Sequence, residues 1–250
     1  MGEKVKCSHP CDKLLRVERL PHIWCPGCGI GIVLHMLIKA IDEANLDPKN
    51  VVVISGIGCS GRFSGYIKTD GAHVLHGRAI PFAIGVKLAN PKLTVIVVGG
   101  DGDIVSIGGN HLIHAARRNI DLKVIMINNM IYGMTGGQLA PTTPKGAYTT
   151  TSPQGNIEEP INAVALAAVS GATFVSRWTV AHPINMKECF KKALKHRGFS
   201  FIEVVSDCPE IFGRLNGIRN PSELIRKIKL ISKIRNNIDP RDAHMVWDKE

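Results

Sequence analysis

The sequence has few aromatic residues, no hydrophobic run of membrane-spanning length and no long block of lysine and arginine. Aromatic side chains make up 5% of the 250 residues. A transmembrane helix needs roughly 18 consecutive apolar residues, and no segment of the sequence reaches that length. The first ten residues are polar and lack the apolar core of a signal peptide. These absences predict a cytoplasmic protein that neither enters a membrane nor binds nucleic acid.

The cysteine content does not indicate a disulfide framework. Seven cysteines are an odd number, and their spacing is typical of ligands to a metal or cluster. A length of 250 residues allows one large domain or two small ones, and a hydrophobic fraction of 44% supports a buried core. The formal net charge of +10 suits anionic cofactors and an acidic protein partner.

Two apolar runs end in polar turns that contain candidate metal ligands. The run 93–98 is predicted to be a buried strand, because it is short, rich in β-branched residues and followed by glycines before Asp101. A second run, 123–127, ends just before Asn129. The spacing of 28 positions fits one strand–helix–strand unit, so both side chains would reach the same edge of a parallel sheet. Either turn alone is ordinary turn chemistry, but the pair favours a site for Mg²⁺ and a diphosphate.

Four cysteines form a second candidate ligand set. Cys25 and Cys28 form a C-x-x-C turn, which is found in redox pairs, zinc sites and iron–sulfur sites. Cys59 and Cys208 each follow a predicted strand, so both are expected at the edge that carries Asp101. Four thiolates at that edge could hold a structural zinc ion or a [4Fe–4S] cluster, and the spacing alone leaves both open.

Strands and helices alternate along the chain. Strands are predicted at 51–55, 93–98, 123–127, 172–175 and 201–205, and helices at 29–46, 76–88, 161–169 and 183–196, with one more ending at 118. The segments 60–76 and 141–153 are expected to be loops, the second a surface lid or subunit contact. This alternation predicts a doubly wound, mostly parallel α/β sheet.

The predicted domain organisation has three parts. Residues 1–24 are expected to form an N-terminal strap, 25–220 the domain that carries both ligand sets, and 221–250 a helical tail. The tail contains an amphipathic helix with a basic outer face. It could pack on the domain, cover the site or bind a partner, and packing is favoured over a membrane surface because no aromatic residue anchors it.

Seven motifs together resemble one enzyme family. They are WCPGCG at 24–29, GIGCSG at 56–61, LHGRAIPFAIGVKLANP at 75–91, GGDGD at 99–103, GGNHLIHAARRNIDL at 108–122, NNMIYGMTGGQ at 128–138 and DCPEIFGRLNG at 207–217. The GDG and Asn pair resembles the diphosphate motif of thiamine-diphosphate enzymes. The whole set resembles the β subunit of the 2-oxoacid:ferredoxin oxidoreductases, especially the 2-oxoglutarate synthase branch, over about residues 12–220.

The resemblance implies the cofactors thiamine diphosphate, Mg²⁺ and a [4Fe–4S] cluster, and it assigns residues to each. Magnesium would be held by Asp101, Asn129 and the carbonyl of Ile131. The cluster would be held by Cys25, Cys28, Cys59 and Cys208. The implied cofactor contacts come from Ile57, Gly58, Cys59, Ser60, His76, Gly100, Gly102, Asp103, Gly133, Met134 and Thr135. The same family resemblance favours the cluster over zinc.

The implied activity is the reversible oxidative decarboxylation of a 2-oxoacid to acyl-CoA and CO₂, with ferredoxin as electron acceptor and 2-oxoglutarate as the expected substrate. No catalytic residue is assigned within this chain. Thiamine enzymes need a glutamate beside the aminopyrimidine ring, and no glutamate here stands in such a motif. An α subunit that supplies it is therefore an expected partner, with further small subunits, ferredoxin, coenzyme A and the 2-oxoacid.

Arg62 is the candidate contact for the distal carboxylate of 2-oxoglutarate, since an arginine can bind a carboxylate through two parallel hydrogen bonds. It could equally be a surface or phosphate-binding residue. The alternatives for function are a pyruvate or branched-chain 2-oxoacid:ferredoxin oxidoreductase β subunit, half of a non-oxidative thiamine-dependent decarboxylase, and a zinc-stabilised binding module. The second of these would have no use for the four cysteines.

Overall fold

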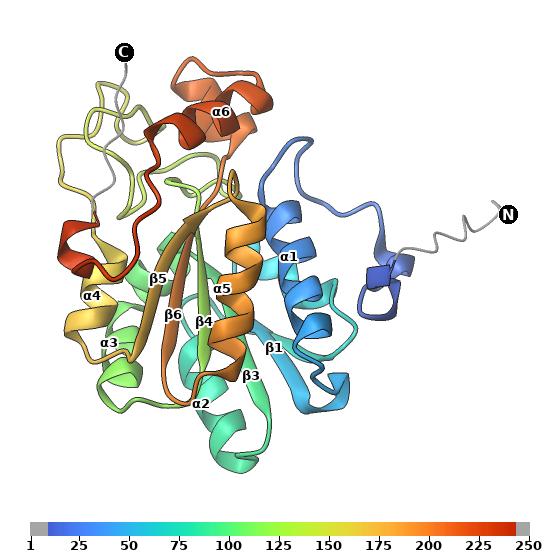
Figure 1. Ribbon diagram of the computed structural model, residues 1–250. Coiled ribbons are helices and arrows are strands. Elements are labelled where there is room, and N and C mark those ends of the chain that lie inside the picture. Colours follow the sequence, from blue (N-terminus) through green and yellow to red (C-terminus); the bar gives the residue numbers. More distant parts are fainter. Residues whose placement is uncertain (1–9, 244–250) are drawn as a thin grey trace, which may run out of the picture.

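The computed structural model describes residues 10–243, and its centre is a six-stranded sheet (Figure 1). The strand order is β2–β1–β3–β4–β6–β5, and every neighbouring pair is parallel. The strands are β1 Val51–Ser55, β2 Asp70–His73, β3 Thr94–Gly100, β4 Lys123–Asn128, β5 Phe174–Thr179 and β6 Ser200–Val205. The predicted doubly wound α/β fold is confirmed.

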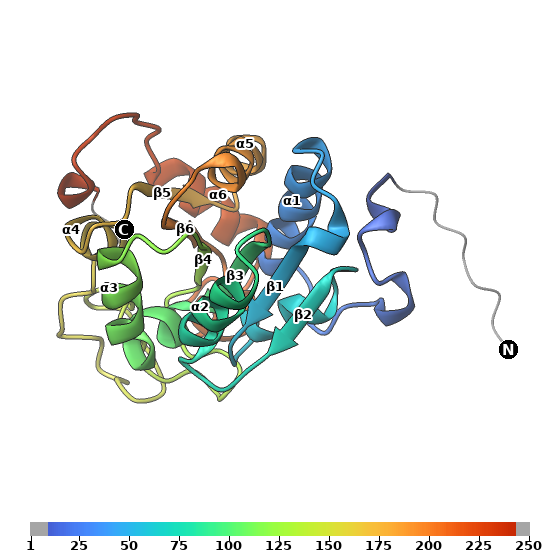
Figure 2. The ribbon, with the colours of Figure 1, turned by 90° about the horizontal axis from the view of Figure 1, so that it is seen from below.

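Helices cover both faces of the sheet. α1 and α5 pack together on one face, and α2, α3 and α4 cover the other, as the view along the strands shows (Figure 2). Their bounds are α1 Ile30–Glu43, α2 Ala79–Ala89, α3 Gly109–Arg117, α4 Ala163–Val169 and α5 Pro183–Lys195. A sixth helix, α6 Pro221–Ile231, lies beyond the carboxyl ends of the strands (Figure 1). No helix in the described part of the chain is long and apolar enough to cross a membrane.

The central strands are buried on both faces, which is why their sequences are nearly continuous apolar runs. Every residue of β1, β4 and β6 is buried. Parallel strands covered by helices on both sides show this pattern rather than alternation. Each fully buried valine or isoleucine contributes about 1.5–3 kcal/mol relative to an exposed one. The carboxyl ends of these strands are therefore held on a rigid base.

Two segments differ from the expectation. The predicted loop 60–76 contains a 3-10 helix, Ser60–Gly65, and the edge strand β2. β2 has the sequence Asp-Gly-Ala-His, which has low strand propensity, and it becomes a strand by pairing with β1. The segment after Asp101 begins with a π-helix, Gly102–Ile107, before α3 starts.

Other element boundaries shift by a few residues. The strand predicted at 172–175 lies at 174–179, and β3 and β4 extend beyond the predicted ends by two residues and one residue. The helix predicted from 161 starts at Ala163, because the Asn162 side chain caps it by accepting a hydrogen bond from the backbone N–H of Ala165 at 3.3 Å. In the tail, Leu224 and Ile228 of α6 are buried, so that face of the helix packs on the domain.

Candidate functional site

The carboxyl ends of four neighbouring strands form one edge of the sheet, here named the site edge. β1, β3, β4 and β6 lie side by side in that order and run in the same direction. Cys59, Asp101, Asn129 and Cys208 each follow one of these strands within a few residues. The topology therefore brings together residues that are up to about 150 positions apart in the sequence.

Gly133 is the point on which three of these side chains converge. A β-carbon at Gly133 would lie 3.6 Å from Asn129 Nδ2, 3.6 Å from Cys208 Sγ and 3.8 Å from Cys59 Sγ. Groups that follow three different strands thus surround one glycine. Any side chain at this position would fill the space between the amide and the two thiols.

Asp101 is almost fully buried at 3% exposure, and hydrogen bonds fix its carboxylate. Oδ1 accepts a hydrogen bond from the Gly102 N–H at 3.0 Å, and Oδ2 accepts from the Met130 N–H at 3.1 Å and from the Thr142 hydroxyl. Each carboxylate oxygen can accept more than one contact. Asp101 is therefore held rigidly against the turn after β4 while keeping capacity for a cation.

The environment of Asp101 favours a nearby positive charge. Burial raises its pKa from 3.8 to about 6, although the Thr142 hydroxyl and the N–H groups of Gly102 and Met130 act in the opposite direction. Burial disfavours an ionised carboxylate that has no counter-charge. A divalent cation at this position would supply that charge.

The turn after β4, residues 128–131, has an unusual backbone and many supports. Met130 has a φ of +63°, a left-handed conformation that is uncommon for a residue with a side chain. Its N–H donates to Asn128 Oδ1 at 3.0 Å as well as to Asp101, and its carbonyl accepts from the Thr143 hydroxyl at 2.7 Å. Strain of this kind costs about 1–3 kcal/mol and persists only where the surroundings hold it. These contacts determine where Asn129 and Ile131 lie.

Asp103 joins two loops at the site edge. Its Oδ1 accepts hydrogen bonds from the Ile57 N–H at 3.3 Å and the Gly77 N–H at 2.7 Å, and it lies 2.8 Å from His76 Nδ1. Burial raises the pKa of Asp103, and these donors partly offset the effect. The side chain is 1% exposed. Asp103 thus holds the loop after β1 against the segment before α2.

The four candidate cluster ligands lie near one another and range from exposed to buried. Cys25 is exposed, Cys28 and Cys59 are half-buried, and Cys208 is buried. Cys28 Sγ lies 3.9 Å from the carbonyl oxygen of Asp207, the residue before Cys208. The indole N–H of Trp24 donates to the carbonyl of Cys59 at 2.7 Å and ties the C-x-x-C segment to the loop after β1.

Electrostatic coupling also links these thiols. Burial raises the pKa of Cys59 to about 11, and the neighbouring Cys208 and Cys25 add to the increase. Burial likewise raises the pKa of Cys28 to about 12, with further contributions from Asp207, Cys208 and Cys59. A metal that binds Cys28 and Cys59 would therefore have to displace their protons.

Comparisons with known proteins give the family. Residues 56–204, more than half of the chain, match the thiamine pyrophosphate enzyme, C-terminal TPP binding domain. The chain is 53% identical over 236 residues to the 2-oxoglutarate synthase subunit KorB of Methanothermobacter marburgensis, covering 94% of this chain and 81% of that protein. It is 53% identical over 221 residues to the subunit of the same name from Methanocaldococcus jannaschii, covering 88% of this chain and 82% of that protein. The chain belongs to the β-subunit family of the 2-oxoacid:ferredoxin oxidoreductases.

A solved structure supports the family assignment. The 2-oxoglutarate:ferredoxin oxidoreductase from Magnetococcus marinus, with 2-oxoglutarate, coenzyme A and succinyl-CoA bound, matches with a TM-score of 0.82 and 33% identity. The match covers 97% of this chain and 78% of that one. The resemblance to the 2-oxoglutarate synthase branch is confirmed at the level of family and fold.

The other expected cofactor contacts of this β subunit lie in four segments at the site edge. These segments are the loop after β1 with Ile57, Gly58 and Ser60, the residue His76 before α2, the β3 end with Gly100, Gly102 and Asp103, and the segment just beyond the turn after β4 with Gly133, Met134 and Thr135. Gly102 packs against the Tyr132 ring, since a β-carbon there would lie 2.1 Å from it. Arg62 is exposed on the 3-10 helix that follows Cys59.

The predicted surface loop 141–153 is partly wrong, because its first turn is buried at the site. Thr142 and Thr143 are 2% and 0% exposed, and they bind Asp101 and the Met130 carbonyl. Thr142 and Thr143 stand between two prolines, and the sequence there has no hydrophobic periodicity that would predict their burial. Glu203 was also missed, although a lone glutamate within the apolar run 201–205 is a signal that a polar partner is required.

No three histidine, cysteine, aspartate or glutamate side chains between residues 10 and 243 are placed as ligands of one metal ion. A groove of about 1020 Å³ lies between β5 and the C-terminal segment 232–243, and Met130 and Arg177 are among its lining residues. A second hollow, lined by Ile57, Leu75 and Phe82, opens beside the loop after β1.

Proposed function

We propose that this chain is the β subunit of an oxidoreductase that converts 2-oxoglutarate, coenzyme A and oxidised ferredoxin to acyl-CoA, CO₂ and reduced ferredoxin, reversibly. The observation that carries the proposal is the site edge. There, four adjacent strand ends bring an aspartate and an asparagine to the same place as a set of cysteines. The family membership supports the same activity.

The residues at the site edge fit a magnesium–diphosphate unit. Asp101 is a buried carboxylate with a raised pKa that pairs with no lysine or arginine among residues 10–243, and Asn129 lies at the neighbouring strand end. We propose these two side chains and the Ile131 carbonyl as protein ligands of Mg²⁺, with diphosphate oxygens and water completing the octahedron. Thiamine diphosphate, when bound, supplies the electron sink that allows a 2-oxoacid to lose CO₂.

The four cysteines fit a [4Fe–4S] cluster, which Cys25, Cys28, Cys59 and Cys208 would bind through one thiolate each. Such a cluster accepts one electron at a time, which suits the transfer of two electrons to ferredoxin in two steps. The convergence of Cys59 and Cys208 on Gly133 beside Asn129 supports a cluster next to the diphosphate site. The alternative is a structural zinc ion, which would require all four thiolates on a single ion.

The chain's own residues hold the proposed ligands and the surrounding loops in place. Asp103 fixes the loop after β1, Thr142 and the Met130 N–H fix Asp101, and Trp24 fixes the carbonyl of Cys59. Glu203 already binds Arg177 and Asn128, so it is not a candidate for the activating glutamate. We therefore propose that an α subunit supplies that residue and that the isolated β subunit is inactive.

Metal and cofactor analysis of the anaerobically purified complex with its α subunit tests the proposal, together with an assay of ferredoxin reduction by 2-oxoglutarate. We expect about four iron atoms and one thiamine diphosphate per β chain, and reduction that requires coenzyme A. One zinc ion per chain would favour the binding module. Decarboxylation without ferredoxin reduction would favour the non-oxidative decarboxylase.

Arg62 carries the substrate preference in this proposal. Its exposed side chain follows Cys59 by three residues and is available to the distal carboxylate of 2-oxoglutarate. Arg62→Ala should raise the KM for 2-oxoglutarate about tenfold, with a much smaller effect for pyruvate, because one charge-assisted contact is worth about 1.5–3 kcal/mol. Lys68→Ala, an exposed cation in the same segment, is the matched control. Equal increases for both substrates would remove Arg62 from this role.

A further inference from the structure

We propose that Glu203 is a positioning residue for the turn after β4, and that the C-terminal segment 232–243 holds Glu203 in place through Arg177. This inference rests on the proposed function, because the turn carries the expected magnesium ligands Asn129 and Ile131. It assigns a role to a buried glutamate and to a C-terminal segment that the cofactor motifs do not include.

The first step joins Glu203 to the turn. Glu203 is 1% exposed, in the middle of β6, and its Oε1 accepts a hydrogen bond from Asn128 Nδ2 at 2.7 Å. A carboxylate can only accept, so the Asn128 amide must present its nitrogen to Glu203. Its oxygen then faces the Met130 N–H at 3.0 Å. Glu203 therefore fixes the orientation of the amide that supports the left-handed Met130 backbone.

The second step joins Glu203 to the edge of the sheet. The two residues Arg177 and Glu203 are direct neighbours in the pairing of β5 with β6. Arg177 Nε donates to Glu203 Oε2 at 2.7 Å, so both carboxylate oxygens of Glu203 are bound. A buried charge pair of this kind is costly to break from either side. The geometry of Glu203 thus depends on where Arg177 lies.

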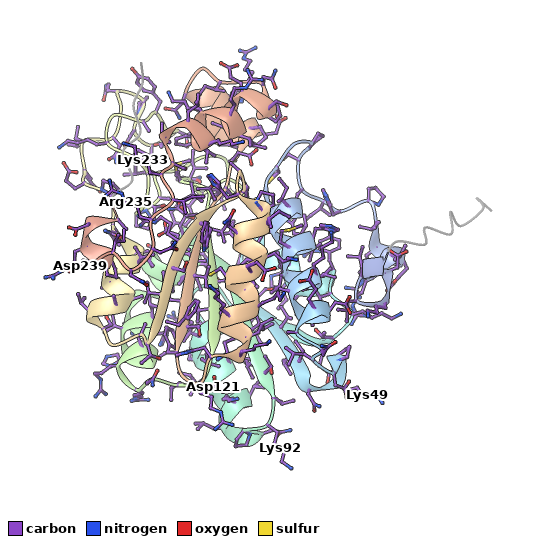
Figure 3. All side chains as sticks on the ribbon, viewed as in Figure 1. Lys49, Lys92, Asp121, Lys233, Arg235 and Asp239 are labelled. Atoms are coloured by element: carbon purple, nitrogen blue, oxygen red, sulfur yellow. The ribbon has the colours of Figure 1, made fainter. Side chains whose placement is uncertain are left out.

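The third step joins Arg177 to the C-terminal segment. Arg177 Nη1 donates to the carbonyl of Ala243, and Nη2 donates to Asn162 Oδ1 at 3.0 Å. Asn162 Nδ2 in turn donates hydrogen bonds to the carbonyl oxygen of Pro240 at 3.3 Å and to that of Ala243 at 3.2 Å. Figure 3 shows Lys233, Arg235 and Asp239 along this segment on the β5 side of the molecule. Three successive polar contacts therefore connect the chain near residue 243 with the turn at the site edge.

The connection also runs along the wall of the groove of about 1020 Å³ between β5 and the C-terminal segment. Met130, Arg177 and Ala243 all line this groove. Ala243 also packs against the apolar core beside α4, while the groove leaves the space between the segment and the turn open. Hydrogen bonds to Arg177 and Asn162 add to this packing and link residues 240–243 to β5 and α4, so loss of the segment should loosen Arg177 and then Glu203.

The test measures the dissociation constant of thiamine diphosphate in saturating Mg²⁺ by calorimetry, on the complex with the α subunit. Glu203→Gln should weaken binding about tenfold, because an amide can present its nitrogen to Asn128 and reverse that side chain. A chain that ends at Asn237, and so lacks the contacts of Pro240 and Ala243, should weaken binding by a smaller factor in the same direction. Lys123→Met, at the other end of β4, is the control and should leave the dissociation constant unchanged.

Exchanging the Asn128 amide and the Glu203 carboxylate distinguishes an effect on the position of the turn from an effect on the stability of the fold. Asn128→Asp combined with Glu203→Gln places the amide on β6 and the carboxylate on β4, so the oxygen facing the Met130 N–H is restored. Binding should return to within about threefold of the original value, whereas Asn128→Asp alone should bind worst because two buried carboxylates then face each other.

The outcomes distinguish this inference from the proposed function. If the unmodified complex does not bind thiamine diphosphate, the proposed function fails. If it binds, and Glu203→Gln lowers the melting temperature but leaves the dissociation constant unchanged, Glu203 has only a structural role and the inference is overturned. If Glu203→Gln does not fold, the exchange variant decides: restored folding without restored binding also overturns it.

Discussion

The two ends of the sheet differ in how their buried charged side chains are compensated. At the amino ends of β4 and β6, buried Lys123 binds Asp121 and the carbonyls of His196 and Gly198, and Lys87 also pairs with Asp121. At the site edge, Asp101 is buried with hydrogen bonds but pairs with no lysine or arginine in the part of the chain that the structure describes. Figure 3 shows Asp121 at the end of the molecule opposite Lys233.

The pKa directions show the consequence. Burial alone would raise the pKa of Asp121, but hydrogen bonds and charge from Lys123 and Lys87 outweigh it and the pKa falls. At Asp101 burial outweighs the hydrogen bonds, and the pKa rises to about 6. At one end the buried carboxylate is paired with lysines, and at the other the buried carboxylate would be stabilised by the Mg²⁺ that we propose there. The difference distinguishes residues that stabilise the fold from the residues that we propose as ligands.

The largest effect expected at the site edge is loss of the cluster. Cys208→Ser should reduce the iron content from about four atoms per chain to nearly none, because one of four thiolate ligands is removed. Cys189→Ser is the matched control, since Cys189 is a buried thiol within α5 that packs in the core. Iron and sulfide analysis after anaerobic purification measures the effect. Equal iron in both variants would exclude Cys208 as a ligand.

Asp101→Asn should weaken Mg²⁺-dependent binding of thiamine diphosphate by about 100-fold or more, since it removes the anionic ligand while keeping the shape. The unfolding free energy should change by no more than about 1–2 kcal/mol, because removal of a buried charge opposes the loss of an acceptor for one of the three donors to Asp101. Calorimetric titration and thermal unfolding of the same samples measure both quantities. A large loss of stability with intact affinity would assign Asp101 to the structural class of Asp121.

Lys123→Met should show the reverse pattern. It leaves Asp121 with one cation fewer and two backbone carbonyls without their donor, which should cost about 2–4 kcal/mol of unfolding free energy. Affinity for thiamine diphosphate should not change. Urea unfolding of the chain measures the first quantity, and a loss of affinity that matches the loss of stability would show that the two ends are not independent.

The smallest expected effect is a pH dependence of the empty protein. Because the folded-state pKa of Asp101 is raised to about 6, its contribution to stability is fully present below about pH 4 and is lost as the pH rises through 6. The unfolding free energy should therefore be about 1–2 kcal/mol higher at pH 5 than at pH 7.5 from this residue.

Variants at the two ends of the sheet check the direction of this pH dependence. Asp101→Asn should remove this gain. Asp121→Asn should leave it, because the lowered pKa of Asp121 places its own loss of stability below pH 4. Chemical unfolding of cofactor-stripped protein at the two pH values measures the difference. An unchanged gain in Asp101→Asn would mean that another group carries it.

The sequence predicted the parts of the fold whose signal is local. The central strands were found because burial on both faces requires continuous apolar runs, and 51–55 was placed at its observed bounds. β2 was missed because its polar sequence becomes a strand only through pairing with β1. The helix start at Ala163 depends on the cap at Asn162, which fixes a boundary that periodicity leaves open.

The candidate site was predictable only where a motif marks it. Asp101 and Asn129 stand at strand ends, so topology brings them together. Thr142 reaches Asp101 because a long segment folds back over the turn, and no local pattern encodes that path. Glu203 lies inside a strand, and its partners Asn128 and Arg177 come from strands 75 and 26 positions earlier. Such long-range polar contacts require the three-dimensional structure.

The most direct test of the central claim is the iron, zinc and thiamine diphosphate content of the β chain purified anaerobically with its α subunit. The account predicts about four iron atoms and one thiamine diphosphate per chain, with no stoichiometric zinc. One zinc ion, or thiamine diphosphate bound without iron, would contradict the claim that the site edge holds an electron acceptor beside a magnesium–diphosphate unit.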